Sequence, residues 1–370
     1  MSNFSNINKT SSNNFFDMNE LFMERIGSPS LVIDGLYLFF ILPLSAGCIL
    51  FNFITFLLLQ SKKVQKTSLN ILIKIYTFTS LSICTMIFMK ALTSIPRYTS
   101  FSYTHSARIF TCYVNTFGMN LLIFFANLLN IVVLVERLSM FVIRFRKFHT
   151  KHPYEYTRLI FVISVLVNLI FYFQTETKSD NQFMFNKNNL TLLIELERCD
   201  LTEFGKSVYA KVGMAIAIFF DNFLTLVIEI VAGFISIKYF RQFVKHREIL
   251  INLEHHKNIQ IWQFADTNQI VNELSIINNS PEQANQDLGQ LVYELNTSIT
   301  RFIISLTIFS VFANMISIVN GVLYIIYDID GMLFSLTAFF FNLIYLIKHG
   351  SIFFFLILLN RNFRKYLFNC

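Results

Sequence analysis

Residues 131–145 read IVVLVERLSMFVIRF, a long apolar run that is interrupted by the adjacent charges of Glu136 and Arg137. Charged side chains are costly inside a lipid bilayer, so a pair in this position needs a physical reason. The pair could be a polar anchor at the membrane surface, or it could be a mechanistic switch. The organisation of the rest of the chain decides between these two interpretations.

The composition of the chain indicates a membrane protein. Hydrophobic residues make up 54% of its 370 residues and charged residues only 14%, which is more apolar than a soluble domain. The net charge of +7 could suggest a nucleic-acid partner, but the basic residues lie in short segments between apolar runs. We therefore expect contact with membrane lipid and no nucleic-acid partner.

Seven apolar runs are each long enough to cross a hydrocarbon core, which takes about 20 helical residues. Each run must be helical, because backbone exposed to lipid cannot leave its N–H and C=O groups unpaired. The sequence therefore predicts an all-α membrane protein with a bundle of seven transmembrane helices. The expected spans are Leu31–Leu59, Leu69–Leu92, Ile109–Ile143, Tyr156–Phe173, Val208–Ile237, Ile299–Ile326 and Met332–Leu359.

The segments outside the spans complete the domain organisation. Residues 1–30 form a polar N-terminal tail, and residues 31–359 form the transmembrane domain with a long third inner loop over residues 238–298. Residues 360–370 are expected to form a short amphipathic helix along the membrane surface. Phe363 and Leu367, four residues apart, would lie on its apolar face.

The loop charges favour an orientation with the N-terminus outside the cell. Lysine and arginine are dense on the opposite side, in the first two loops there (62–66 and 144–158) and in the tail (361–365). The sequence thus predicts a multi-pass plasma-membrane protein with an extracellular N-terminus. Three sequons fall on the predicted outer side, where each is either glycosylated or unmodified. They begin at Asn3, Asn8 and Asn189.

Two cysteines also fall on the predicted outer side. Cys112 lies at the outer end of the third span, and Cys199 lies in the long loop after the fourth span. Both would face an oxidising compartment, where they could pair with each other or remain independent thiols. Cys48 and Cys84, in contrast, lie within apolar spans and are expected to be small buried hydrophobic residues.

The chain resembles the rhodopsin-like G-protein-coupled receptors. Arg137 follows Cys112 by 25 residues, which is the interval in that family between the outer disulfide cysteine and the arginine of the Asp/Glu-Arg-Tyr motif. Here the motif reads Glu136-Arg137-Leu138. The resemblance implies a disulfide between Cys112 and Cys199. It also implies that Glu136 holds Arg137 in the resting state and that Arg137 meets a heterotrimeric G protein after activation.

Other positions both extend and weaken the resemblance. Asn52 matches the first-span asparagine of the family by its distance from the basic first inner loop. Ser80 stands where the second span of the family carries an aspartate, so the sodium pocket of the family is in doubt. The seventh span lacks the Asn-Pro-x-x-Tyr motif. At the base of the sixth span the chain offers Thr300 and Arg301, and repulsion between Arg301 and Arg137 would loosen the resting state.

Three charged residues inside the spans are candidates for function. Asp221 and Glu229 are costly to bury, and a spacing of eight residues places them ~80° apart around a helix. Asp221 could serve a basic ligand group or an internal pair with a lysine. Lys348 invites comparison with retinal-binding lysines, although its flanking sequence shows no other opsin feature. The asparagines of the third span are expected to be interhelical hydrogen-bond partners.

These observations favour a receptor that transmits binding of an extracellular ligand, a neuropeptide in our interpretation, to a heterotrimeric G protein. A chemosensory receptor for a small molecule is the alternative ligand class. A seven-span ion channel should have its N-terminus inside, and a transporter should show repeated halves. No nucleophile–base pair, metal-ligand spacing or phosphate-binding loop is present. We therefore expect neither an enzyme nor a bound cofactor.

Overall fold

Seven membrane-crossing helices form the fold of this protein. The computed structural model describes residues 29–61, 67–95, 104–141, 153–185, 191–254, 281–326 and 332–359. Within these ranges, seven helical segments are long and apolar enough to span a bilayer, which confirms the predicted all-α membrane bundle. They are Val32–Gln60, Ser68–Thr93, His105–Ser139, Pro153–Tyr172, Val208–Gln242, Thr300–Leu323 and Ser335–Leu358.

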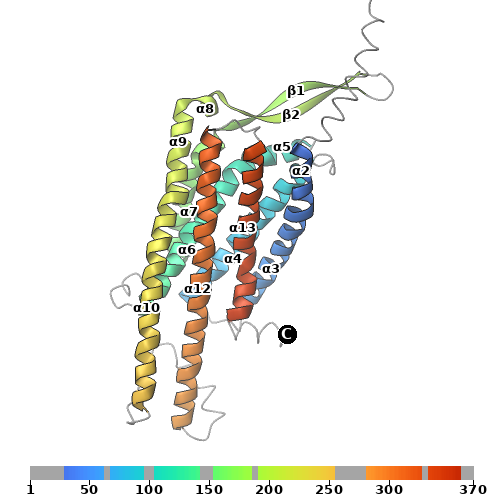
Figure 1. Cartoon of the computed structure of the whole chain (residues 1–370). Coiled ribbons are helices and arrows are strands. Elements are labelled where there is room, and N and C mark those ends of the chain that lie inside the picture. Colours follow the sequence, from blue (N-terminus) through green and yellow to red (C-terminus); the bar gives the residue numbers. More distant parts are fainter. Residues whose placement is uncertain are drawn as a thin grey trace, which may run out of the picture.

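Three of the spans are composite, because a wide π-helical turn interrupts the α-helix (Figure 1). Such turns are often found at functional sites. In chain order the elements are α2 (Pro29–Leu36), η1 (Tyr37–Ile41), α3 (Leu42–Gln60), α4 (Ser68–Thr93), α5 (His105–Ile109), η3 (Phe110–Gly118), α6 (Met119–Phe141), α7 (Pro153–Tyr172), β1 (Thr175–Phe185), β2 (Thr191–Leu201), α8 (Glu203–Lys206), α9 (Val208–Ile218), η5 (Phe219–Leu224), α10 (Thr225–Glu254), α12 (Pro281–Ile326) and α13 (Met332–Leu359).

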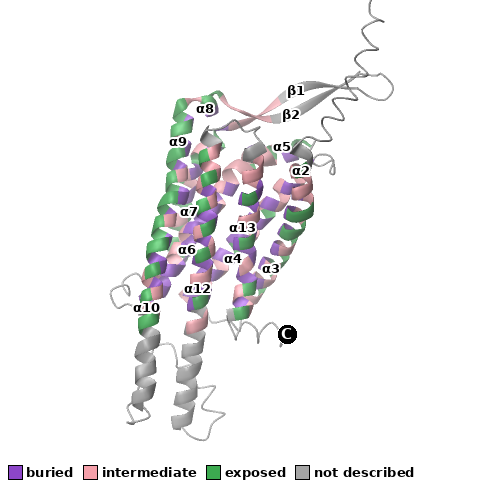
Figure 2. Ribbon diagram, viewed as in Figure 1, coloured by how far each residue is buried: buried purple, intermediate pink, exposed green. Residues whose placement is uncertain are grey.

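The third span, which contains α6, is the centre of the bundle. It contacts α4, α7, α10 and α12. In its apolar window 61% of the residues are buried, against 17% in α7, and Figure 2 shows purple along the inner helices and green on the outer ones. Polar groups on α6 are therefore placed where they can reach several other spans.

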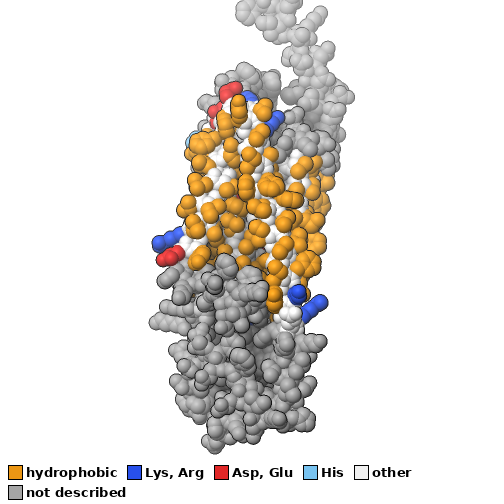
Figure 3. Space-filling model, turned by 90° about the vertical axis from the view of Figure 1, so that its left-hand side faces the viewer, with side chains coloured by type: hydrophobic (Ala, Val, Ile, Leu, Met, Phe, Trp, Pro, Cys, Tyr) orange, Lys and Arg blue, Asp and Glu red, His pale blue; other side chains and the backbone are white. Residues whose placement is uncertain are grey.

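The outer face of the bundle is apolar because it faces lipid rather than water. Large hydrophobic side chains are widely exposed there, including Phe39 at 72%, Leu166 at 66% and Phe234 at 71%. Figure 3 shows such side chains covering the described part of one side of the molecule, with charged groups near the two ends of that described surface. In a soluble protein so large an apolar surface would be an interaction site, but here its position identifies the membrane-facing belt.

A β-hairpin lies beyond one end of the bundle (Figure 1), and the sequence analysis did not predict it. Strands β1 and β2 have 11 residues each and pair antiparallel, from Thr175 opposite Leu201 to Phe185 opposite Thr191. We call this end of the bundle the hairpin end. The opposite end, where α6 carries Arg137, is called the Arg137 end.

Several sequence predictions fall at the margins of the described chain. Residues 238–254 and 281–298, parts of the expected inner loop, continue α10 and α12 as helix. The amphipathic helix predicted over residues 360–370 lies outside the described residues, and so does the polar tail of residues 1–28.

The contact between the first and seventh spans generates a testable prediction. A Cβ atom added at Gly350 of α13 would clash with Cys48 Sγ of α3, so only glycine lets these helices approach so closely. We expect Gly350→Ala to destabilise the protein by about 1–3 kcal/mol. Far-UV circular dichroism during thermal unfolding in detergent measures the change.

The matched control is Gly35→Ala, because a Cβ at Gly35 meets no atom within 4 Å. Cys48→Ala removes the clashing sulfur and should recover most of the loss caused by Gly350→Ala. A Gly350→Ala variant as stable as the Gly35→Ala control would show that α3 and α13 do not pack in this way.

Candidate functional site

Arg137 and Glu136 are both buried at the Arg137 end of α6. The side chains are 2% and 1% exposed, so neither reaches the membrane surface as an interfacial anchor would. The structure thus disfavours the surface-anchor interpretation of the charge pair. Both residues lie inside the bundle, where a charged side chain must be held by protein groups.

The hydrogen bonds of Arg137 connect α6 to the sixth span. Its Nε and Nη2 both donate to Thr300 Oγ1 of α12, at 3.0 and 2.8 Å. Thr300 is 1% exposed, whereas the Arg301 side chain is exposed. Thr300 rather than Arg301 therefore faces Arg137, so the expected repulsion between the two arginines is replaced by a hydrogen-bonded contact, which we call the Arg137–Thr300 latch.

A second buried polar site surrounds Glu229 of α10 in the middle of the bundle. Its Oε1 accepts hydrogen bonds from Asn130 Nδ2 at 2.8 Å and from Ser310 Oγ at 2.7 Å, and its Oε2 accepts one from Asn314 Nδ2 at 3.0 Å. Glu229 is fully buried. Three donors from α6 and α12 thus satisfy a carboxyl group that has no access to water, as a buried charge requires.

Lys348 of α13 belongs to the same site. Its Nζ donates to Asn127 Oδ1 at 2.8 Å and lies 5.4 Å from the centre of the Tyr345 ring. Asn127 Nδ2 in turn donates to Asn314 Oδ1 at 3.0 Å. The side chain of Lys348 is fully buried. An imine bond to a retinal-like aldehyde would remove this hydrogen-bonded ammonium group.

These contacts form one directed relay from a cation to an anion. Lys348 donates to Asn127, Asn127 donates to Asn314, and Asn314 donates to Glu229. The direction is forced, because an ammonium group can only donate and a carboxylate can only accept. Hydrogen bonds aligned in this way polarise one another in a low-dielectric interior. We call this set, together with Asn130 and Ser310, the Glu229–Lys348 network.

Helix periodicity explains how the sequence builds the network. Asn127 and Asn130 are three residues apart on α6, and Ser310 and Asn314 are four residues apart on α12. Both spacings place two polar groups on one face of a helix. α6 and α12 therefore each present a pair of polar side chains to α10 and α13.

Asn52 and its neighbours tie the first two spans to the seventh. Asn52 Nδ2 donates to His349 O at 3.2 Å and to Cys48 O at 2.9 Å, and it lies 3.7 Å from Cys84 Sγ. Ser80 Oγ lies 2.9 Å from His349 Nδ1. At the position where the resembled family has an aspartate, this chain thus has a serine bonded to a histidine of α13.

Asp221 lies in the wide turn η5 and does not join the network through its carboxyl group. The side chain is 5% exposed and lies against Asn168 of α7, while its backbone carbonyl accepts from Asn127 Nδ2 at 3.3 Å. Of the two roles considered for Asp221, the structure disfavours an internal pair with a lysine, because Lys348 is engaged by Asn127. The wide turn takes up one extra residue, so the angle between Asp221 and Glu229 falls from ~80° toward ~20°.

Cys112 and Cys199 form a disulfide at the hairpin end, with Cα atoms 5.4 Å apart. The bridge attaches β2 to η3 of the third span. A hydrogen bond of 2.6 Å from Thr175 Oγ1 to Cys112 O attaches the base of β1 to the same point. The predicted sequons at Asn3, Asn8 and Asn189 lie outside the described residues.

Sequence reasoning missed the residues of the sixth span that complete the sites. Ser310, Asn314 and Thr300 were not singled out as functional partners, although the spacing of Ser310 and Asn314 was a usable signal. Within the described ranges, no group of three or more His, Cys, Asp and Glu side chains is arranged to hold a metal ion.

Comparison with known proteins adds no family assignment: no protein-family model matches the chain, and no curated protein sequence matches it. The site is therefore interpreted from its own geometry.

The relay generates a prediction about stability. We expect Lys348→Met to destabilise the bundle by about 3 kcal/mol, because Asn127 loses its donor and Glu229 loses the nearby positive charge. Glu229→Gln added to Lys348→Met should recover part of this loss, because it removes the uncompensated carboxylate. SDS-induced unfolding in mixed micelles measures Lys348→Met, Glu229→Gln and the double variant.

The control for charge removal is Lys211→Met, since Lys211 is an exposed lysine of α9. We expect Lys211→Met to leave the free energy of unfolding within about 0.5 kcal/mol of the wild type. Strictly additive effects of Lys348→Met and Glu229→Gln would contradict the relay, because side chains that share a network must be energetically coupled.

Proposed function

We propose that this protein is a receptor that transmits ligand binding at the hairpin end to a heterotrimeric G protein at the Arg137 end. The proposal places the hairpin end outside the cell and the Arg137 end in the cytosol, and it assigns no catalytic reaction to the chain. The observation that carries it is the Arg137–Thr300 latch, a buried contact between the central helix and the sixth span.

The latch has the properties of a reversible contact. A hydrogen bond from a charged donor to a neutral hydroxyl contributes about 1.5–3 kcal/mol, which is enough to favour one arrangement of two helices without fixing it. Movement of α12 away from α6 would release the guanidinium group. Arg137 would then be available to donate hydrogen bonds to a carbonyl or carboxylate group of a partner that enters between the helices.

The Glu229–Lys348 network supports transmission between the two ends. Asn130 and Arg137 lie on α6, and their separation of seven residues is about 10 Å along the axis. Ser310 and Thr300 lie on α12, about 15 Å apart. One displacement of α12 relative to α6 therefore changes both sites, so a ligand that favours that displacement would open the latch.

The hairpin supports a peptide as the ligand. A sheet of two strands has only edge strands, whose outward N–H and C=O groups are not paired within the sheet. An extended peptide can add to such an edge by main-chain hydrogen bonds. The disulfide to η3 would bring a peptide bound there to the mouth of the bundle. A small chemosensory ligand remains the alternative ligand class.

The proposal predicts opposite effects for the two halves of the latch. Thr300→Val removes the acceptor with little change in volume, so we expect guanine-nucleotide exchange without ligand to rise severalfold. Arg137→Ala should reduce both basal and ligand-stimulated exchange to background, because the contact with the G protein is lost. The measurement is exchange on a panel of heterotrimeric G proteins, with receptor in nanodiscs and a peptide library.

Arg301→Ala is the matched control, because it removes an exposed arginine next to Thr300 and should leave exchange unchanged. Thermal unfolding of each variant verifies that the bundle is intact. Unchanged exchange in a folded Arg137→Ala receptor would overturn the proposal. Labelling of an N-terminal tag in intact cells separates a receptor from an ion channel, since a tag that faces the cytosol would favour the channel.

A further inference from the structure

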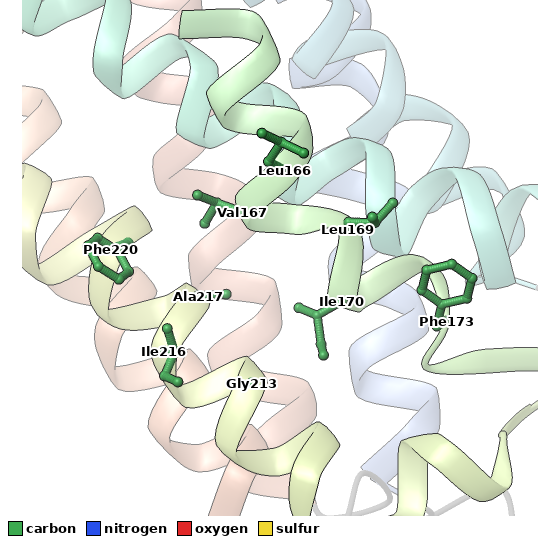
Figure 4. Close-up of a pocket in the computed structure, with 9 residues that line it drawn as sticks. All are labelled: Leu166, Val167, Leu169, Ile170, Phe173, Gly213, Ile216, Ala217 and Phe220. Carbon is green, nitrogen blue, oxygen red and sulfur yellow. The ribbon is translucent and has the colours of Figure 1, made fainter.

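An apolar groove runs along the lipid-facing seam between the fourth and fifth spans (Figure 4). It has a volume of about 450 Å³ between α7 on one side and α9 with η5 on the other, and each of its nine lining residues is apolar or glycine. Its outer rim is open, because Leu166 is 66% exposed and Ile216 is 53% exposed. Its floor is closed by Ala217, which is 2% exposed.

The position of the groove determines how an occupant would reach it. α7 and α9 are membrane-crossing segments, and the groove lies on their membrane-facing side. Water and water-soluble peptides do not reach such a surface, so an occupant must first dissolve in the bilayer. The apolar lining favours a hydrocarbon chain or ring system.

Phe220 and Val167 line the groove from its two sides in Figure 4, and each is followed in the sequence by a polar residue. Asp221 directly follows Phe220, and Asn168 directly follows Val167. The Asp221 side chain is 5% exposed and that of Asn168 is fully buried, and the two lie against each other across the seam. The same seam thus carries a hydrocarbon groove and a carboxyl group.

Among the described residues, each of these two side chains has one oxygen atom without a hydrogen-bond donor. In the described chain, Asp221 Oδ1 and Asn168 Oδ1 have no hydrogen-bond partner. Lys348, a fully buried cation of the seventh span, donates to Asn127 instead. A buried carboxylate oxygen needs a donor, and a positively charged donor satisfies it best.

We propose that the groove and Asp221 together bind a lipophilic amine that enters sideways from the bilayer. Its hydrocarbon part fills the groove over Ala217, and its ammonium group donates to Asp221 and Asn168. Rotation of Phe220, whose side chain is 42% exposed, gives the ammonium group access to the carboxyl group. This site is separate from the hairpin, and it does not depend on coupling to a G protein.

The test uses the full chain in nanodiscs of zwitterionic lipid with radiolabelled dodecylamine as the probe. Binding to empty nanodiscs is subtracted, and dodecanol and dodecanoate serve as competitors of equal chain length. We expect saturable binding of dodecylamine that is at least tenfold weaker in Asp221→Asn. Neither the alcohol nor the carboxylate should displace the amine at equal concentration.

Two further variants test the groove itself. Ile216→Trp places a bulky side chain on the groove wall and should weaken dodecylamine binding at least tenfold. Val231→Trp is the matched control, because Val231 has nearly the same exposure, 52%, on the lipid-facing side of α10 away from the groove. Saturable binding that is equal in the wild type and Asp221→Asn would overturn the proposal, and so would displacement by dodecanol or the absence of saturable binding.

Discussion

The arrangement of the bundle depends on a relay of three hydrogen bonds that joins the Lys348 ammonium group to the Glu229 carboxyl group through Asn127 and Asn314. A bilayer offers no water to either charge, so each charge must be satisfied by other spans. The relay uses groups from α6, α10, α12 and α13. The relative positions of these four helices are consequently fixed by polar contacts as well as by apolar packing. In lipid, apolar packing alone distinguishes only weakly between one neighbouring helix and another.

The functional proposal follows from the position of the Glu229–Lys348 network on α6 and α12, the two helices that also carry the Arg137–Thr300 latch. α6 carries two residues of the network and Arg137, and α12 carries two residues of the network and Thr300. The third span is also held at the hairpin end by the disulfide from Cys112 to Cys199. The central helix is thus attached covalently at the hairpin end, while the bonds that hold α12 in these sites, those of the latch included, are side-chain hydrogen bonds. A change in ligand contacts would therefore act on α12 more easily than on α6.

The sequence predicted the spans well but the sites only in part, and the reason is physical. Length and hydropathy determine which segments cross a bilayer, so all seven spans were predicted close to their observed bounds. The cost of charges in lipid also singled out Glu136, Arg137, Glu229 and Lys348, but it left open whether the Glu136–Arg137 pair lies at the membrane surface or inside the bundle. Their partners did not follow, because the choice of Thr300 over Arg301 depends on the rotation of α12 about its axis. In the fifth span, the wide turn η5 changes the rotation of the helix about its own axis, and no residue pattern indicated this turn. The hairpin was missed because its strands lie outside the membrane, where hydropathy gives no signal.

The central claim is that the Glu229–Lys348 network holds the Arg137 end of α12 in place. The most direct test is a spin-label distance measurement between Glu155→Cys of α7 and Arg301→Cys of α12, two exposed positions at that end, in a Cys370→Ser background. The account predicts one narrow distance distribution in the otherwise wild-type protein. It predicts a second, longer distance when Lys348→Met breaks the relay. An unchanged distribution in folded Lys348→Met protein would contradict it.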